Sequence, residues 1–211
     1  MIVIVECGLG NAGSILNMLR YIGRRDVAIS GDPEIVSSAS KVILPGVGAF
    51  DAGMESIRLA GLRNILDKKA LVEKVPVLGI CLGMQLLARD SEEGKLPGLS
   101  WIRGAVVRFR FDGQHAALKV PHMGWNSVRP TPSSVLMRGY DDADPRYYFV
   151  HSYHILCDDQ ADVAGQTTYG YDFCSVVEHD NIMGVQFHPE KSHKFGMKLL
   201  ENFASIGGAG C

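Results

Sequence analysis

The sequence has no run of apolar residues long enough to cross a bilayer, which takes about 20 consecutive residues in a membrane helix. It also lacks a positively charged leader and a cleavage site, so Ile2-Val3-Ile4-Val5 predicts a strand and not a signal peptide. An excess of basic residues is missing as well, because the formal net charge is −2. We therefore expect neither a membrane partner nor a nucleic-acid partner.

Cysteine pairs at metal-binding spacing are absent too. The five cysteines are an odd number without a C-x-x-C motif, which argues against a disulfide scaffold or structural zinc and predicts a reducing, cytoplasmic location. Since the histidines show no metal-ligand spacing with carboxylates, we expect no metal and no cofactor. With 211 residues, 46% of them hydrophobic, the chain can form one domain over residues 1–206, followed by a flexible tail at 207–211.

What is present centres on one turn. The apolar run 75–80 predicts a buried strand, and helix-forming residues follow at 84–88. Gly79-Ile80-Cys81-Leu82-Gly83 joins the two and matches a nucleophile elbow that carries sulfur in place of a hydroxyl. Glycines at both ends let backbones pass closely. Cys81 would then lie at a helix N-terminus, where the thiolate is favoured. The alternative is a buried structural cysteine.

A second segment supplies partners for such a nucleophile. Residues 181–187 predict a short strand, and His188-Pro189-Glu190 follows it. His188 and Glu190 are two residues apart, so an extended backbone would place both on one face. A cysteine nucleophile needs a base, and the base needs a group that orients it. Alone, these two residues would be read as a surface turn; with the elbow, they predict a Cys81–His188–Glu190 triad.

A glycine-rich loop follows another predicted strand at 41–44. Its residues Gly46, Val47 and Gly48 could turn backbone amides towards a ligand. Acyl transfer builds negative charge on a substrate oxygen, which fixed N–H groups stabilise, so we predict an oxyanion loop. The alternative is an ordinary strand-to-helix turn.

The first unit carries a competing signal. Gly8-x-Gly10-x-x-Gly13 follows a strand and opens a helix, as in a dinucleotide fingerprint, and Asp32 lies near the end of the second strand. A tight turn needs glycines for its own reasons, however, and a nucleotide site leaves the triad unexplained. A nucleotide-binding module stays open as an alternative.

The order of elements predicts the fold class. Strands and helices alternate as far as residue 74, which indicates an α/β doubly wound parallel sheet with helices on both faces. The second half predicts added antiparallel strands at 101–111, 117–120, 126–129, 147–153 and 174–178, and a closing helix at 195–206.

Three segments together, 44–50, 79–85 and 184–190, resemble the class I, triad-type glutamine amidotransferases, so the fold should be the mixed sheet of that family. Residues 121–126 and 148–153 are similar to the glutaminase subunits of imidazole glycerol phosphate synthases. The resemblance implies that Cys81 attacks the side-chain amide of glutamine, that His188 protonates the departing ammonia, and that water then releases glutamate from a thioester. It also implies that Gln85, Glu93, His151, Ser152 and Tyr153 bind glutamine.

The same resemblance implies a partner. Ammonia would pass to a (βα)₈-barrel cyclase that makes imidazole glycerol phosphate and a carboxamide ribonucleotide in histidine biosynthesis, because bulk water would protonate it. The family places the following positions at or near the cyclase: Asn11, Met123, Trp125, Tyr148 and Lys191. For Trp125 and Tyr148, packing in the core is the alternative.

Departures from the family keep other interpretations open. The first turn reads Glu6-Cys7 where the family usually has Asp-Tyr. The segments 51–54, 108–112 and 152–154 are similar to a paralogous amidotransferase that supplies a cyclase-like partner in surface-sugar biosynthesis. A cysteine peptidase on the same kind of sheet is the competing enzyme class.

Overall fold

A sheet of eleven strands forms the centre of the computed structural model, which describes residues 1–8, 10–140 and 144–207. Its first part consists of five parallel strands in the order β2 (Val27–Ser30), β1 (Ile2–Val5), β3 (Lys41–Gly46), β4 (Val77–Cys81) and β13 (Ile182–Val185). The four inner strands are almost wholly buried, as expected when helices cover both faces of a parallel sheet. The doubly wound sheet predicted from the sequence is confirmed.

Antiparallel strands extend this sheet beyond β13. The order continues with β12 (Tyr171–His179), β10 (Tyr153–Cys157), β6 (Gly104–Arg108) and the short β5 (Asp90–Ser91). A further strand, β11 (Val163–Tyr169), pairs with β12 and with β8 (Arg129–Pro130). The antiparallel addition in the second half of the chain therefore agrees with the sequence pattern.

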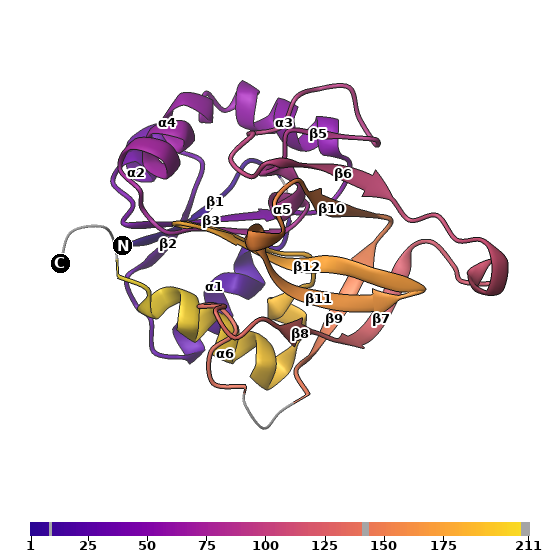
Figure 1. The fold of residues 1–211 in the computed structure, drawn as a ribbon. Helices are drawn as coiled ribbons and strands as arrows, with labels where there is room; N and C mark the ends of the chain where they lie inside the picture. Colours follow the sequence, from indigo (N-terminus) through magenta and orange to yellow (C-terminus); the bar gives the residue numbers. More distant parts are fainter. Residues whose placement is uncertain (9, 141–143, 208–211) are drawn as a thin grey trace.

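Two strands leave the central sheet and form a separate ribbon, β7 (His122–Ser127) with β9 (Arg146–His151). The sequence predicted one strand from 147 to 153, but the chain breaks at Ser152 and continues as β10 in the central sheet. Figure 1 shows the ribbon beside β11 and β12, on the side of the sheet that carries α6. We call β7 and β9 the ribbon below.

Helices cover both faces of the sheet (Figure 1). One face carries α1 (Ala12–Tyr21) and α6 (His193–Ser205); the other carries α2 (Pro33–Ser37), α3 (Phe50–Leu59), α4 (Arg63–Asp67) and the π-helix Lys68–Val72. A short helix, α5 (Leu82–Leu86), follows β4. In the part of the chain that the structure describes, none of the helices has the length and apolar character to cross a membrane.

Two further sequence expectations were wrong. The predicted strand 117–120 is irregular: Leu118 N donates to His115 O, which closes a turn after the 3₁₀ turn Gly113–His115. The strand predicted from 101 to 111 is shorter, since only Gly104–Arg108 pairs with β10. The sequence also missed β11, whose Gln and Thr residues obscure the pattern although Thr167 is buried.

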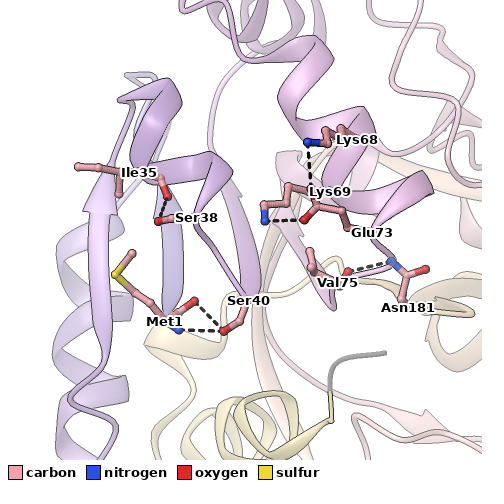
Figure 2. A network of polar contacts seen from close by, with 9 residues as sticks. All are labelled: Met1, Ile35, Ser38, Ser40, Lys68, Lys69, Glu73, Val75 and Asn181. Atoms are coloured by element: carbon pink, nitrogen blue, oxygen red, sulfur yellow. Dashed lines mark hydrogen bonds and ion pairs between the residues drawn. The ribbon is translucent and has the colours of Figure 1, made fainter. Parts of the chain in front are cut away.

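Polar contacts fasten the end of the sheet where the parallel strands begin (Figure 2). The ammonium group of Met1 donates to Ser40 Oγ over 2.8 Å, and Asn181 Nδ2 donates to Val75 O over 2.8 Å. Lys69 pairs with Glu73 over 2.7 Å at the end of the π-helix. These contacts lie at the end of the sheet where the strands begin. Open α/β sheets bind their ligands at the opposite end, where the strands finish, so we expect a site there.

A very close contact between α5 and β3 generates the first prediction. A Cβ built on Gly83 would overlap the carbonyl oxygen of Leu44, so Gly83→Ala must displace α5 from β3. We expect it to lower the free energy of unfolding by about 3 kcal/mol, measured by urea denaturation.

The matched control is Gly13→Ala. Gly13 lies inside α1, and its nearest neighbour to an added Cβ is Asn11 Oδ1 at 3.9 Å. Since alanine favours helix over glycine, Gly13→Ala should leave stability unchanged or raise it by up to about 1 kcal/mol. Equal stability of the two variants would contradict the close packing described for Gly83.

Candidate active site

Cys81 lies at the end of β4, where the strand turns directly into α5. Its backbone adopts φ 55° and ψ −109°, a conformation that residues with a Cβ rarely populate. The glycines on either side of Cys81 let the strand and the helix pack closely, because a Cβ on Gly79 would lie 2.6 Å from the carbonyl oxygen of Gly83. The strand–turn–helix arrangement expected for an elbow is therefore present.

His188 reaches this turn from the other half of the chain. Strand β13 lies parallel to β4, with Val185 opposite Ile80, so both strands end at the same edge of the sheet. The His188 N–H donates to Tyr148 O over 2.9 Å, which fixes the backbone to the ribbon. The alignment of β13 with β4 thus carries His188 to Cys81.

Glu190 orients the imidazole. Its Oε1 lies 2.8 Å from His188 Nδ1, and both side chains are almost completely buried. The contact does not come from extended backbone, as the sequence suggested. Pro189–Lys191 forms a 3₁₀ turn, and this turn brings Glu190 back beneath the ring. Since the carboxylate accepts from Nδ1–H, the other ring nitrogen is directed away from it.

The electrostatics of His188 favour its protonated form. Burial lowers the pKa of His188, but the neighbouring Cys81 sulfur and the Glu190 carboxylate outweigh burial and raise that pKa to about 9. Its Nε2 atom is buried and has no hydrogen-bond partner within residues 1–8, 10–140 and 144–207. The Cys81 sulfur nevertheless lies close enough to the imidazole to raise its pKa, and catalytic contacts of this kind often tighten only when substrate binds.

A cavity of about 320 Å³ opens beside Cys81 and His188. Its lining includes seven of the residues predicted for the oxyanion loop and for glutamine binding: Val47, Gly48, Gln85, Glu93, His151, Ser152 and Tyr153. Gly46 lies just outside it, paired with Cys81 in the sheet. The structure thus brings these lining residues, together with Cys81 and His188, from five regions of the sequence to one cavity, most of them at or just after the end of a strand.

The polar groups of this cavity are held by further contacts. Glu93 Oε2 accepts from Phe50 N over 2.9 Å, which joins its loop to the start of α3. Gln85 Nε2 donates to Tyr153 O over 3.1 Å and to Gln186 Oε1 over 3.0 Å. The sequence did not single out Gln186. It lies two residues before His188 near the end of β13, and this alternation was the available signal.

The glycines of the first turn and Asp32 have structural roles that do not require a bound nucleotide. Asp32 caps α2 by accepting from Glu34 N over 2.8 Å, and a Cβ on Gly10 would lie 3.2 Å from Gly46 N. Gly10 therefore serves the packing of this turn against the glycine loop. Burial, together with the charge of Glu6, raises the pKa of Cys7 to about 11, so this thiol is a poor nucleophile.

Comparison with known proteins agrees with this geometry. The family model "Glutamine amidotransferase class-I" matches residues 3–206. The chain belongs to the class-I glutamine amidotransferase family. A protein named "Imidazole glycerol phosphate synthase subunit HisH 2" from Methanococcus maripaludis is 51% identical over 203 residues, 96% of this chain and 98% of that protein. One with the same name from Pseudomonas aeruginosa is 47% identical, over 98% of this chain and all of that protein.

A solved structure shares the amidotransferase fold at low sequence identity. It is a putative GMP synthase protein from Thermoplasma acidophilum, with a TM-score of 0.70 and 22% identity over 96% of this chain and 90% of that one. At this identity the likeness concerns the fold alone.

Among the residues expected at a partner surface of this amidotransferase, Lys191, Tyr148 and Trp125 form a connected row. Asn11 and Glu190 line one small cavity, and the Lys191 ammonium group lies 5.5 Å from the centre of the Tyr148 ring. Tyr148 pairs with Trp125 across the ribbon, whose rings are 6.3 Å apart. Trp125 is 43% exposed and Met123, one turn of the pleat away, is 61% exposed. Core packing of Trp125 is thus excluded in this chain.

The part of the amidotransferase that the structure describes contains no preformed metal site. No three His, Cys, Asp or Glu side chains gather there in a way that could hold a metal ion.

The pKa of His188 can be measured directly. We expect its imidazole to titrate near pH 9 in an NMR titration, above the ordinary value of 6.5. Because the raised pKa stabilises the folded state, this contribution is complete below about pH 6.5 and is lost as the pH rises through 9. Glu190→Gln removes the attracting carboxylate and should lower the pKa.

The control is Glu201→Gln, a change at an exposed carboxylate of α6. It should leave the His188 titration unchanged. A wild-type titration near 6.5 that does not respond to Glu190→Gln would contradict the coupling of these three groups.

Proposed function

We propose that this amidotransferase hydrolyses glutamine to glutamate and ammonia at Cys81. The observation that carries the proposal is the buried His188, oriented by Glu190 and directed towards Cys81 on the wall of a cavity. Nucleophile, base and orienting group are the parts that acyl transfer by cysteine requires. The cavity has the volume of a small-molecule site.

The chemistry proceeds in two halves. The Cys81 thiolate attacks the side-chain carbonyl carbon of glutamine, and the N–H groups of the loop 46–48 stabilise the oxyanion. His188, protonated at neutral pH, gives its Nε2 proton to the departing nitrogen, so that ammonia leaves and a thioester remains. The neutral imidazole then takes a proton from water, which attacks the thioester and releases glutamate. Glu190 keeps Nε2 directed at the reacting atoms throughout.

The remaining cavity residues are assigned to glutamine itself. Glu93 has one carboxylate oxygen bonded to Phe50 N, and its charge at the cavity suits the α-ammonium group of an amino acid. The segment His151-Ser152-Tyr153, where the chain passes from β9 to β10, also lines the cavity and would contact the α-carboxylate. Gln85 donates both hydrogens of its amide to Tyr153 O and Gln186 Oε1, so it would contact glutamine through its own Oε1.

The triad assignment is tested by Cys81→Ala. We expect glutamate release to fall by at least about 10⁴-fold, because the thioester cannot form. The free energy of unfolding should change by no more than about 1 kcal/mol, since the side chain removed is small. Glutamate is measured by an enzyme-coupled assay and stability by urea denaturation.

Full activity of the folded variant would refute the mechanism. A wild-type chain that cleaves an unstructured peptide but not glutamine would instead favour a cysteine peptidase.

The pathway is inferred from the relatives. Their names describe a subunit of imidazole glycerol phosphate synthase, and they span nearly the whole of this chain. We infer that this chain supplies ammonia to a (βα)₈-barrel cyclase of histidine biosynthesis. The partially exposed Met123 and Trp125, with Lys191 beside Tyr148, would face that partner. These side chains combine the aromatic and apolar character of an interface core with a charge at its rim.

The pathway is tested by measuring glutamate release from the chain alone, with the histidine-pathway cyclase, and with cyclase plus its nucleotide substrate. We expect cyclase and nucleotide together to increase turnover, and Trp125→Ala to weaken that increase while leaving the unstimulated rate unchanged. Leu59→Ala, an exposed apolar residue on α3, is the control. Turnover that neither addition alters would reject this pathway and favour the paralogous partner of surface-sugar biosynthesis.

A further inference from the structure

A chain of hydrogen bonds connects the ribbon to the sulfur of Cys81. Its nearest member is Gln186, whose Nε2 lies 3.8 Å from Cys81 Sγ and whose side chain is fully buried. Donor-to-sulfur contacts of this length are hydrogen bonds, because sulfur is large. The question is which end of the amide faces the sulfur, since a carbonyl oxygen there would repel a thiolate.

The backbone carbonyl of Tyr153 decides the orientation. A carbonyl only accepts, so Gln85 must turn its NH₂ group towards it, at 3.1 Å. The second hydrogen of that group then points to Gln186, so the atom of Gln186 that lies 3.0 Å from Gln85 Nε2 must be its acceptor, Oε1. The NH₂ group of Gln186 is left to face Cys81. One backbone oxygen therefore imposes a donor on the sulfur through two side chains.

The same carbonyl fixes the chain in the other direction. His151 Nδ1 lies 2.7 Å from Tyr153 O and must carry a proton, so His151 Nε2 accepts from His122 Nδ1 at 3.0 Å. His122 Nε2 then accepts from Asn126 Nδ2 at 3.3 Å. Burial lowers the pKa of both histidines, that of His122 to about 4, which keeps them neutral as this order requires.

The outer end agrees with this assignment independently. Asn126 Oδ1 accepts from Ser127 N over 2.8 Å, and Asn126 Nδ2 donates to Thr168 O over 2.9 Å. The amide is thus oriented by backbone groups with its NH₂ towards His122. Starting from either end, the same assignment of donors and acceptors results.

We propose that Gln186 is a positioning residue for the nucleophile: its N–H donates to the Cys81 sulfur, in an orientation that the Tyr153 carbonyl dictates through Gln85. Such a bond is stronger to a thiolate than to a thiol, because hydrogen bonds to charged acceptors are about twice as strong. A donor at this position would therefore stabilise negative charge on the sulfur and fix the direction of attack. The inference rests on the proposed function only in that Cys81 is the nucleophile.

The test reads the sulfur itself and not glutamine turnover. Alkylation of Cys81 by iodoacetamide is followed by mass spectrometry of its peptide at pH 7 and at pH 10. In Gln186→Met, which keeps the volume and removes the donor, we expect alkylation at pH 7 to slow by about tenfold and at pH 10 by less than about twofold. Gln186→Glu keeps the acceptor for Gln85 but places a negative charge at the sulfur, and should slow alkylation at pH 7 further.

Thr167→Val is the matched control. It removes a buried hydrogen bond, from Thr167 Oγ1 to Ser175 Oγ, that is not part of the hydrogen-bond series leading to Cys81. It should leave the ratio of the two rates at the wild-type value. A wild-type ratio in Gln186→Met, or in Gln186→Glu if the methionine variant does not fold, would overturn the proposal.

The two hypotheses fail in distinguishable ways. Suppose that the wild-type protein does not hydrolyse glutamine, but that Gln186→Met still slows alkylation of Cys81 at pH 7. This result would refute the proposed function and would support the inference about Gln186. If the protein hydrolyses glutamine but substitutions at position 186 do not change the alkylation of Cys81, the proposed function stands and the inference about Gln186 is refuted.

Discussion

The site depends on how closely three turns can approach one another. Strands β1, β3 and β4 end side by side, and the turns that follow them contact one another at glycines. Gly10 packs on the amide of Gly46, and Gly46 packs on Leu82 and Gly83, where side chains would overlap the neighbouring backbone. This contact brings the glycine loop beside Cys81. The core on both faces of the sheet supports that arrangement, because the buried strands β3 and β4 are held in register beneath the turns.

His188 comes from a part of the chain more than a hundred residues away and has no such local constraint. Its position depends on three elements that meet at one residue: the parallel pairing of β13 with β4, the bond from its backbone to Tyr148 O, and the 3₁₀ turn that carries Glu190. The contact between ribbon and base also explains why a surface row containing Tyr148 and Trp125 lies so close to the chemistry. A partner on that row would touch the strand from which the base is held.

The sequence predicted what local geometry determines. The glycines around Cys81 and the apolar strands of the first half specify a turn and a parallel sheet without reference to distant residues. Pairings between distant segments were harder. The strand expected at 117–120 had suitable residues but no neighbouring strand. Strand β11 was missed because its buried positions, Ala164, Gly165 and Thr167, do not form an alternation of large apolar residues. His188 and Glu190 were paired correctly for a wrong reason, since a turn and not extended backbone joins them. The alternation before His188 pointed to position 186, but the partners of Gln186 and the contact of His122 with His151 could not be foreseen, because they depend on which distant groups each side chain meets.

The Tyr153 carbonyl has a consequence for how related sequences can diverge. Gln85 and Gln186 form a complementary pair in which one must offer a donor and the other an acceptor, although they are 101 residues apart along the chain. A change at either position alone leaves a buried polar atom without its complement, which is costly away from water. We therefore expect positions 85 and 186 to covary across evolutionary time, with amides kept together or exchanged together, whereas the exposed surface drifts independently of both.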